Sequence, residues 1–86
     1  MTVKRIGSNQ TEITKMINGH PVTFLYSYST PVAFKLVQPD GRITAFRTSS
    51  RFSVTTTRHV NKWLASLPSE DIAKTDQAYV EKLANS

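Results

Sequence analysis

The stretch RFSVTTTRHVNKWLASL, residues Arg51 to Leu67, decides the fold because it predicts the first helix of the chain. A helix that begins among Thr55–Thr57 has a threonine hydroxyl to cap its free amide groups, and Pro68 ends it. Four apolar residues recur at i, i+3, i+4 and i+7, so they share one face of the helix: Val60, Trp63, Leu64 and Leu67. This face needs an apolar surface to cover it.

Three turn signals before the helix divide residues 11–48 into four strands. Asn18-Gly19 favours a tight hairpin turn in which both residues take positive φ. Ser29-Thr30-Pro31 predicts a three-residue loop, and Pro39-Asp40-Gly41 predicts a type I turn closed by a glycine bulge. Short loops join neighbouring antiparallel strands, so the prediction is a four-stranded antiparallel meander.

These turns predict a strand register that gathers the large apolar residues on one face of the sheet. Ile13 faces Phe24 across the first hairpin, Tyr28 faces Val32 across the second, and the face as a whole comprises Ile13, Val22, Phe24, Tyr26, Tyr28, Val32, Phe34, Leu36 and Phe46. We expect the helix with Trp63 to pack across this face. Aromatic residues among basic ones also suggest a platform for stacking bases, but packing in a core explains them better.

The opposite sheet face is too apolar at its centre to be bare, since it carries Leu25, Ala33, Val37, Ile43 and Ala45. Residues 68–86 are expected to be helical, with Ser69 as the cap, and either this segment or a partner covers the face. A second copy of the chain, forming a homodimer through this face, is one such partner. The predicted class is α+β, with a flexible arm over residues 1–10, a ββββα domain over 11–67 and a C-terminal helical segment over 68–86.

Composition limits the compartments and the classes of protein that fit. The chain has 86 residues and no cysteine, which excludes disulfides and thiolate metal sites and suits a reducing compartment. No apolar run reaches the ~18 residues of a membrane span, and the first residues lack the apolar core of a signal peptide. We therefore expect a soluble cytoplasmic protein with no membrane contact.

The net charge of +5 is unevenly distributed along the chain. Residues 1–66 hold nine Lys and Arg against two acids, whereas residues 67–86 hold two against four. A basic body favours nucleic acid or an acidic protein surface as partner. The alternative is a solvated surface that keeps a small domain soluble.

The sequence offers little for catalysis, metal binding or cofactor binding. The two histidines, His20 and His59, lie on different predicted elements without cysteine or paired carboxylates nearby. The three glycines form neither a phosphate loop nor a dinucleotide motif. Ser53 and His59 can be combined with a distant acid into a triad, but hydroxyls are too common here for this match to carry information. We expect no enzyme activity, no catalytic residues, no metal and no cofactor.

The candidate binding residues are five cations between the last hairpin and the first helix: Arg42, Arg47, Arg51, Arg58 and Lys62. Serine and threonine hydroxyls surround them, and both groups bind phosphate oxygens. We expect these cations to lie near one end or edge of the molecule. No base-reading pattern is present, so nucleic acid would be bound by its backbone.

Two segments carry a resemblance to a known group of proteins. These are YSYSTPVAF, residues 26–34, and FSVTTTRHVNKWL, residues 52–64. With the Asp40-Gly41 turn between them, they resemble a family of small uncharacterised proteins of tailed bacteriophages, over about residues 16–67. The resemblance implies a phage origin and the host cytoplasm, and it implies no catalytic residue or cofactor.

Two functions follow from these observations. The first is a small basic accessory protein, not an enzyme, that binds the backbone of DNA or RNA without strong sequence specificity. The second is a protein-binding module that inhibits or redirects an acidic host factor through its basic edge or its apolar sheet face. The same arginines attract phosphates and carboxylates, so the sequence does not separate the two.

Overall fold

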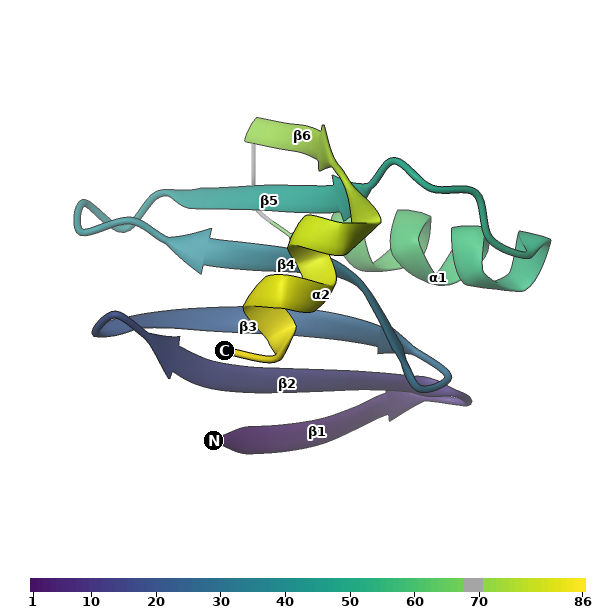
Figure 1. The fold of residues 1–86 in the computed structure, drawn as a ribbon, viewed down its shortest axis with the longest axis horizontal. Coiled ribbons are helices and arrows are strands. Elements are labelled where there is room, and N and C mark those ends of the chain that lie inside the picture. Colours follow the sequence, from purple (N-terminus) through teal and green to yellow (C-terminus); the bar gives the residue numbers. More distant parts are fainter. Residues whose placement is uncertain (68–70) are drawn as a thin grey trace.

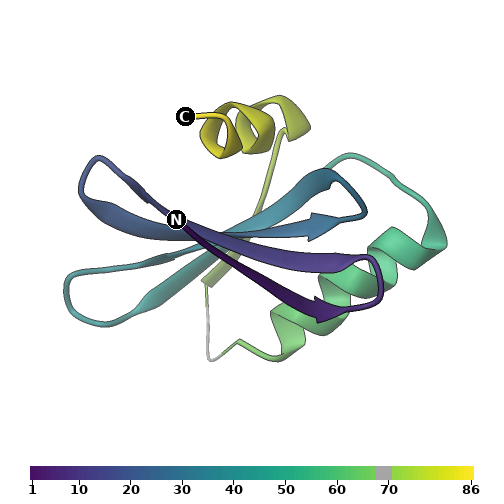
Figure 2. The same ribbon diagram turned by 90° about the horizontal axis from the view of Figure 1, so that it is seen from below.

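The computed structural model describes residues 1–67 and 71–86, which form one six-stranded sheet with a helix on each face (Figures 1 and 2). The elements are β1 (Thr2–Gly7), β2 (Gln10–Ile17), β3 (His20–Ser27), β4 (Thr30–Val37), β5 (Ile43–Thr48), α1 (Val54–Ala65), β6 (Asp71–Thr75) and α2 (Gln77–Ala84). The α+β class is confirmed. The prediction of four strands is corrected to six.

The strands lie in chain order across the sheet, β1-β2-β3-β4-β5-β6. The first five are antiparallel to their neighbours, as predicted for a meander, and β6 runs parallel to β5. Parallel neighbours need a crossover connection, and α1 lies in that connection (Figure 1). The strand before the helix, β5, and the strand after it, β6, are both part of the sheet, so they hold α1 against it.

The first added strand, β1, comes from residues for which the sequence predicted a flexible arm. Thr2–Gly7 pairs with β2 through a tight turn in which Asn9 takes a φ of 59°. Val3 and Ile6 remain exposed, at 60% and 37%. Backbone pairing, with little burial of apolar side chains, therefore holds this strand in place, and the hydrophobic pattern of the sequence does not reveal it.

Two of the three predicted turns have the expected geometry. Asn18 and Gly19 both take positive φ, 52° and 79°, and the resulting register places Ile13 opposite Phe24 as predicted. The turn between β4 and β5 is closed by a bond from the Gln38 N–H to the Arg42 carbonyl oxygen at 2.7 Å, and Phe34 faces Phe46 in the register that follows.

Replacement of Gly19 by alanine is expected to destabilise the protein by about 1–2 kcal/mol, because a side chain at positive φ crowds the backbone. An added Cβ at this position meets no atom within 4 Å, so the loss reflects backbone conformation alone. Urea denaturation measures the change in the free energy of unfolding. Asn18→Gly is the control, with an expected change within about 0.5 kcal/mol. A Gly19→Ala variant as stable as the parent would contradict the assigned turn.

The second hairpin differs from the prediction by two residues in register. Ser27 pairs with Thr30, so the turn consists of Tyr28 and Ser29, and Tyr28 takes a φ of 58°. The register then shifts between Leu25 and Tyr26, and Val32 faces no residue of β3. This bulge moves Val32 away from the aromatic face on which it was predicted. The predicted three-residue loop and the pair of Tyr28 with Val32 are therefore wrong.

Helix α1 begins slightly earlier than predicted, at Val54, and Ser53 caps it in place of a threonine. The Ser53 hydroxyl accepts a hydrogen bond from the Thr56 N–H at 3.2 Å. Thr56 is instead buried beneath the helix. The apolar stripe is confirmed as the buried side of the helix, since Val60, Trp63 and Leu64 are at most 6% exposed.

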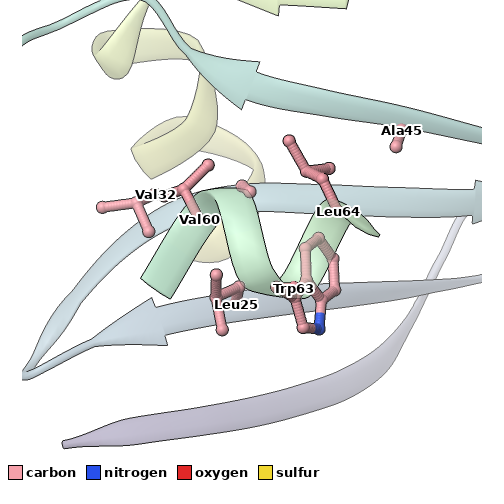
Figure 3. Packing of buried hydrophobic residues seen from close by; sticks show 7 residues of the cluster. Leu25, Val32, Ala45, Val60, Trp63 and Leu64 are labelled. Carbon is pink, nitrogen blue, oxygen red and sulfur yellow. The ribbon is translucent and has the colours of Figure 1, made fainter. Parts of the chain in front are cut away.

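The helix packs on the sheet face opposite to the predicted one. Val60, Trp63 and Leu64 form a core cluster with Leu25, Val32, Ala33 and Ala45, with Leu67 packed against it (Figure 3). Leu25, Ala33 and Ala45 were predicted to be covered by the tail or a partner. α1 therefore covers the part of this face that Leu25, Ala33 and Ala45 form.

The aromatic face is covered by α2, which forms a second cluster with Val22, Phe24 and Phe34 through Val80 and Ala84. Two contacts fix this helix at its ends. The Gln77 side chain donates to the Pro31 carbonyl oxygen at 2.8 Å, and the Lys15 ammonium donates to the carbonyl oxygens of Ala84 and Ser86. Burial raises the pKa of the Tyr26 phenol on this face above its ordinary value.

The C-terminal segment is helical only in part. Asp71–Thr75 forms β6, whereas the sequence predicted helix there, and α2 begins at Gln77 after Asp76. The predicted cap, Ser69, lies outside the described residues. Parallel pairing with β5 supplies hydrogen bonds that the short sequence DIAKT would not secure alone. The strand also brings a new cation to the edge of the sheet.

Candidate functional site

A polar pocket of about 300 Å³ lies where the end of β5, the β5–α1 loop, the start of α1 and β6 meet. We call it the basic pocket, and the residues that line it are Arg47, Thr48, Ser49, Ser50, Arg51, Phe52, Thr57 and Lys74. Its lining has three cations and four hydroxyl groups. No carboxylate is among the lining residues within the described part of the chain. Such a lining can bind anions.

Arg47 lies on β5 and points to the α1 side of the sheet, where its Nη1 donates to Asn61 Oδ1 at 3.0 Å. This bond holds the guanidinium between sheet and helix. The Nε–H of Arg47 is buried and has no acceptor among residues 1–67 and 71–86. The guanidinium therefore has one unused hydrogen-bond donor. A buried donor without a partner costs about 1–3 kcal/mol.

Lys74 is the functional candidate that the sequence did not reveal. It lies on β6 directly beside Arg47 in the parallel ladder, so both side chains project from the same face of the sheet. Residues 68–86 were predicted to be helical, which gave no reason to place Lys74 near β5. No local pattern could have done so, because aspartate, alanine and lysine are poor strand formers.

The loop that forms one wall of the basic pocket is fixed by its backbone. The Ser49 N–H donates to the Thr75 carbonyl oxygen at 2.8 Å, which joins the loop to the end of β6. The Ser50 N–H donates to Thr48 Oγ1 at 3.1 Å. Because these amides are already bonded, an anion in the pocket would be held by side chains. Arg51 follows directly and is exposed.

The other predicted site residues lie outside the pocket. Arg58 and Lys62 are exposed and lie one turn apart on α1, and Lys62 lines a second hollow with Lys4 and Trp63. Arg42 lies in the β4–β5 turn, at the far end of β5 from the basic pocket (Figure 1). The expectation that all five cations lie at one end or edge of the molecule is therefore wrong for Arg42.

Positive charge gathers on the side of the sheet that α1 covers. The register places Lys4 and Arg47 on this side, and Lys35 joins them with its ammonium 5.9 Å from the centre of the Trp63 ring. With the cations of the pocket and of α1, seven Lys and Arg side chains share the layer: Lys4, Lys35, Arg47, Arg51, Arg58, Lys62 and Lys74. Among the carboxylates whose side chains are described, Glu12 lies in this layer, and it accepts a bond from Trp63 Nε1 at 2.7 Å. We call this surface the α1 layer.

A serine and a histidine do approach each other, but they are not the pair considered from the sequence. Ser27 Oγ lies 2.8 Å from His59 Nδ1 and 3.0 Å from Thr56 Oγ1, whereas Ser53 caps α1. Ser27 is only 2% exposed, so its hydroxyl is closed to a substrate. The cluster joins the end of β3 to α1 and satisfies polar groups in the core.

No helix in residues 1–67 or 71–86 is long and apolar enough to cross a membrane. Three or more potential metal ligands from His, Cys, Asp and Glu do not gather anywhere in the same part of the chain.

Comparison with known proteins places the chain in a family. Residues 1–81 match the model of a family of unknown function, DUF8033, so the chain belongs to that family. The match includes β1, β6 and most of α2, and with them every residue of the α1 layer. No curated protein and no solved structure matches the chain significantly.

Proposed function

We propose that this member of the family binds the phosphate backbone of DNA or RNA through the α1 layer, without strong sequence specificity and without catalysis. The observation that carries the proposal is the separation of charge. Seven cations share one layer, whereas the one carboxylate described there, Glu12, is engaged by Trp63. A surface of this kind attracts polyanions and releases their counterions on binding.

The exposed cations of α1 suit a repeating anion. Arg58 and Lys62 are four residues apart, which corresponds to about 6 Å along the helix axis. Phosphates repeat along each strand of a duplex with a rise of about 3.4 Å along its axis, so two cations at this spacing can contact phosphates close together on one strand. Like charges at i and i+4 repel each other by a few tenths of a kcal/mol, and a phosphate between them removes this cost.

The hydroxyls around the cations favour phosphate over a plain carboxylate surface. Ser49, Ser50 and Thr57 stand beside Arg51 and Lys74 in the basic pocket, and hydroxyl donors are common partners of phosphate oxygens. Asn61 is the amide side chain of α1 that could read an adenine, and its Oδ1 is already bonded to Arg47. The proposal is therefore backbone recognition.

The phage origin and the host cytoplasm belong to this proposal, and their support is the resemblance described above. An acidic host protein is the second candidate for the same cations. A host lysate treated with nuclease separates the two, because capture of a protein that survives nuclease treatment favours the protein partner.

Charge reversal on α1 tests the proposal. Arg58→Glu together with Lys62→Glu is expected to abolish binding to duplex DNA, single-stranded DNA and RNA at low salt, as measured by fluorescence anisotropy. Both side chains are exposed, so the fold should persist. The single variant Arg58→Glu is compared with the control Lys82→Glu. Both variants change the net charge by the same amount, but Lys82 lies on α2, on the other face of the sheet (Figure 2). Equal losses for these two variants would overturn the α1 layer as the interface.

A further inference from the structure

We propose that the basic pocket takes a terminal phosphate, the phosphomonoester at the end of a nucleic-acid strand. This inference rests on the proposed function and deepens it, because it assigns one part of the α1 layer to a chemically distinct group. The rest of the layer, represented by Arg58 and Lys62, remains the contact for the continuing backbone.

The arrangement of the three cations separates the pocket from the rest of the layer. Arg47 comes from β5, Arg51 from the following loop and Lys74 from β6, and all three line one hollow. Arg58 and Lys62 instead lie in line on one exposed helix surface. Cations that surround a hollow concentrate charge on a single group, whereas cations in a row suit an extended strand.

The charge of the ligand follows from this convergence. A phosphomonoester carries about −1.5 to −2 charges at neutral pH and has three free acceptor oxygens. A phosphodiester within a strand carries one charge and a nucleoside on both sides, so it cannot enter a hollow end-on. Three cations and the hydroxyls of Ser49, Ser50 and Thr57 offer enough donors for three oxygens.

The bonding state of the cations supports an anion in this place. Arg47 has a buried Nε–H without an acceptor in the described part of the chain, although its Nη1 is bonded to Asn61. No carboxylate of the described residues lines the pocket beside Arg51 or Lys74. A buried donor without a partner calls for an explanation, and an anion that draws the guanidinium toward the pocket supplies the missing acceptor.

The size of the pocket fits the end of a strand better than an isolated ion. Its volume of about 300 Å³ is roughly ten times the share of one water in the liquid, about 30 Å³. A phosphate group fills only part of this space. The remainder admits the sugar to which the phosphate is attached, and Phe52, one of the lining residues, supplies an apolar contact for it.

The test compares single-stranded oligonucleotides of one sequence that carry a 5′-phosphate, a 3′-phosphate or hydroxyls at both ends. We expect one of the phosphorylated strands to bind roughly tenfold more tightly than the hydroxyl strand, as one charge-assisted hydrogen bond allows. Lys74→Gln and Arg51→Gln should each remove this preference. Arg58→Gln, which loses the same charge outside the pocket, should weaken all strands equally and keep the preference. Both pocket residues are exposed, so their variants should fold.

A second experiment uses inorganic phosphate, and it distinguishes a free phosphate ion from the phosphate at a strand end as the ligand of the basic pocket. In a nuclear magnetic resonance titration, phosphate alone should shift the Arg47 Nε–H signal and the amides of Ser49 and Ser50, and Lys74→Gln should abolish these shifts. Phosphate binding without binding of any oligonucleotide would overturn both the proposed function and the strand end as ligand.

The remaining outcomes are equally distinct. Equal affinity for phosphorylated and hydroxyl strands would overturn the terminal-phosphate inference and leave backbone binding in place. A preference that survives Lys74→Gln and Arg51→Gln would overturn the basic pocket as its origin. No binding of strands or phosphate would overturn both proposals.

Discussion

Replacement of Trp63 by alanine is expected to lower the free energy of unfolding by about 3–5 kcal/mol, the usual cost of removing a large aromatic side chain from a core. Trp63 is 3% exposed and lies between α1 and the sheet, in the cluster with Leu25 and Leu64 (Figure 3). Its Nε1–H also donates to Glu12 at 2.7 Å, which would lose its partner. Domains of ordinary stability have about 5–15 kcal/mol to lose, and this domain is small, so we expect much of the variant to be unfolded at 37 °C.

Two milder substitutions separate packing from the hydrogen bond. Trp63→Phe removes the donor to Glu12 and keeps most of the apolar ring, so its effect should be clearly smaller than that of alanine. Glu12→Gln keeps an acceptor for the indole N–H and should be milder still. Urea denaturation of the three variants gives the ranking. A Trp63→Ala variant with the melting temperature of the parent would contradict the burial of this side chain and the position of α1.

Local turn chemistry and helix periodicity are the parts of this fold that the sequence makes visible. Asn18-Gly19 requires positive φ at both positions, which few other residue pairs tolerate, and the hairpin register follows from it. The stripe with Val60 and Trp63 identifies the buried side of α1 in the same way. Both inferences depend on neighbours in the chain, so they need no knowledge of tertiary contacts.

The choice of sheet face could not be made from the pattern. Alternation separates Phe24 and Phe34 from Leu25 and Ala33, but both sets are apolar, so each face can receive a helix. The small residues Ala33 and Ala45 leave space for the bulky Trp63, whereas the aromatic face receives the shorter α2 with Val80 and Ala84. Complementary volume decides the pairing, and it is a property of two surfaces together.

The candidate site was also predicted only where its residues are close together in the sequence. Arg47, Arg51, Arg58 and Lys62 could be identified because they lie close together in the chain around the start of α1. Lys74 could not, because it reaches the basic pocket only through the parallel pairing of β6 with β5. Arg42 lies near Arg47 in sequence but at the other end of the same strand, since a strand extends about 3.3 Å per residue.

Salt should weaken nucleic-acid binding steeply, and this is the second large effect expected. Four cations of the α1 layer outside the basic pocket carry the contact: Lys4, Lys35, Arg58 and Lys62. Each phosphate neutralised on duplex DNA contributes about −0.9 to the slope of log affinity against log salt, so four contacts give a slope of about −3.6. Between 50 and 200 mM salt the affinity should fall by roughly 150-fold by the same rule.

Substitution of single lysines shows whether the salt dependence comes from these particular contacts. Lys4→Gln and Lys62→Gln should each make the slope shallower by about 0.9, because each removes one released counterion. Lys82→Gln on α2 changes the net charge equally and should leave the slope unchanged. A slope that responds equally to all three variants would show that net charge, and not the α1 layer, controls binding.

The most direct measurement is therefore the affinity of the whole chain for two unrelated duplexes of equal length, by fluorescence anisotropy across this range of salt. Backbone binding through the α1 layer predicts similar affinities for both duplexes and a slope near −3.6. Absence of binding to duplex DNA at low salt, with the same absence for single-stranded DNA and RNA, would contradict the proposed function.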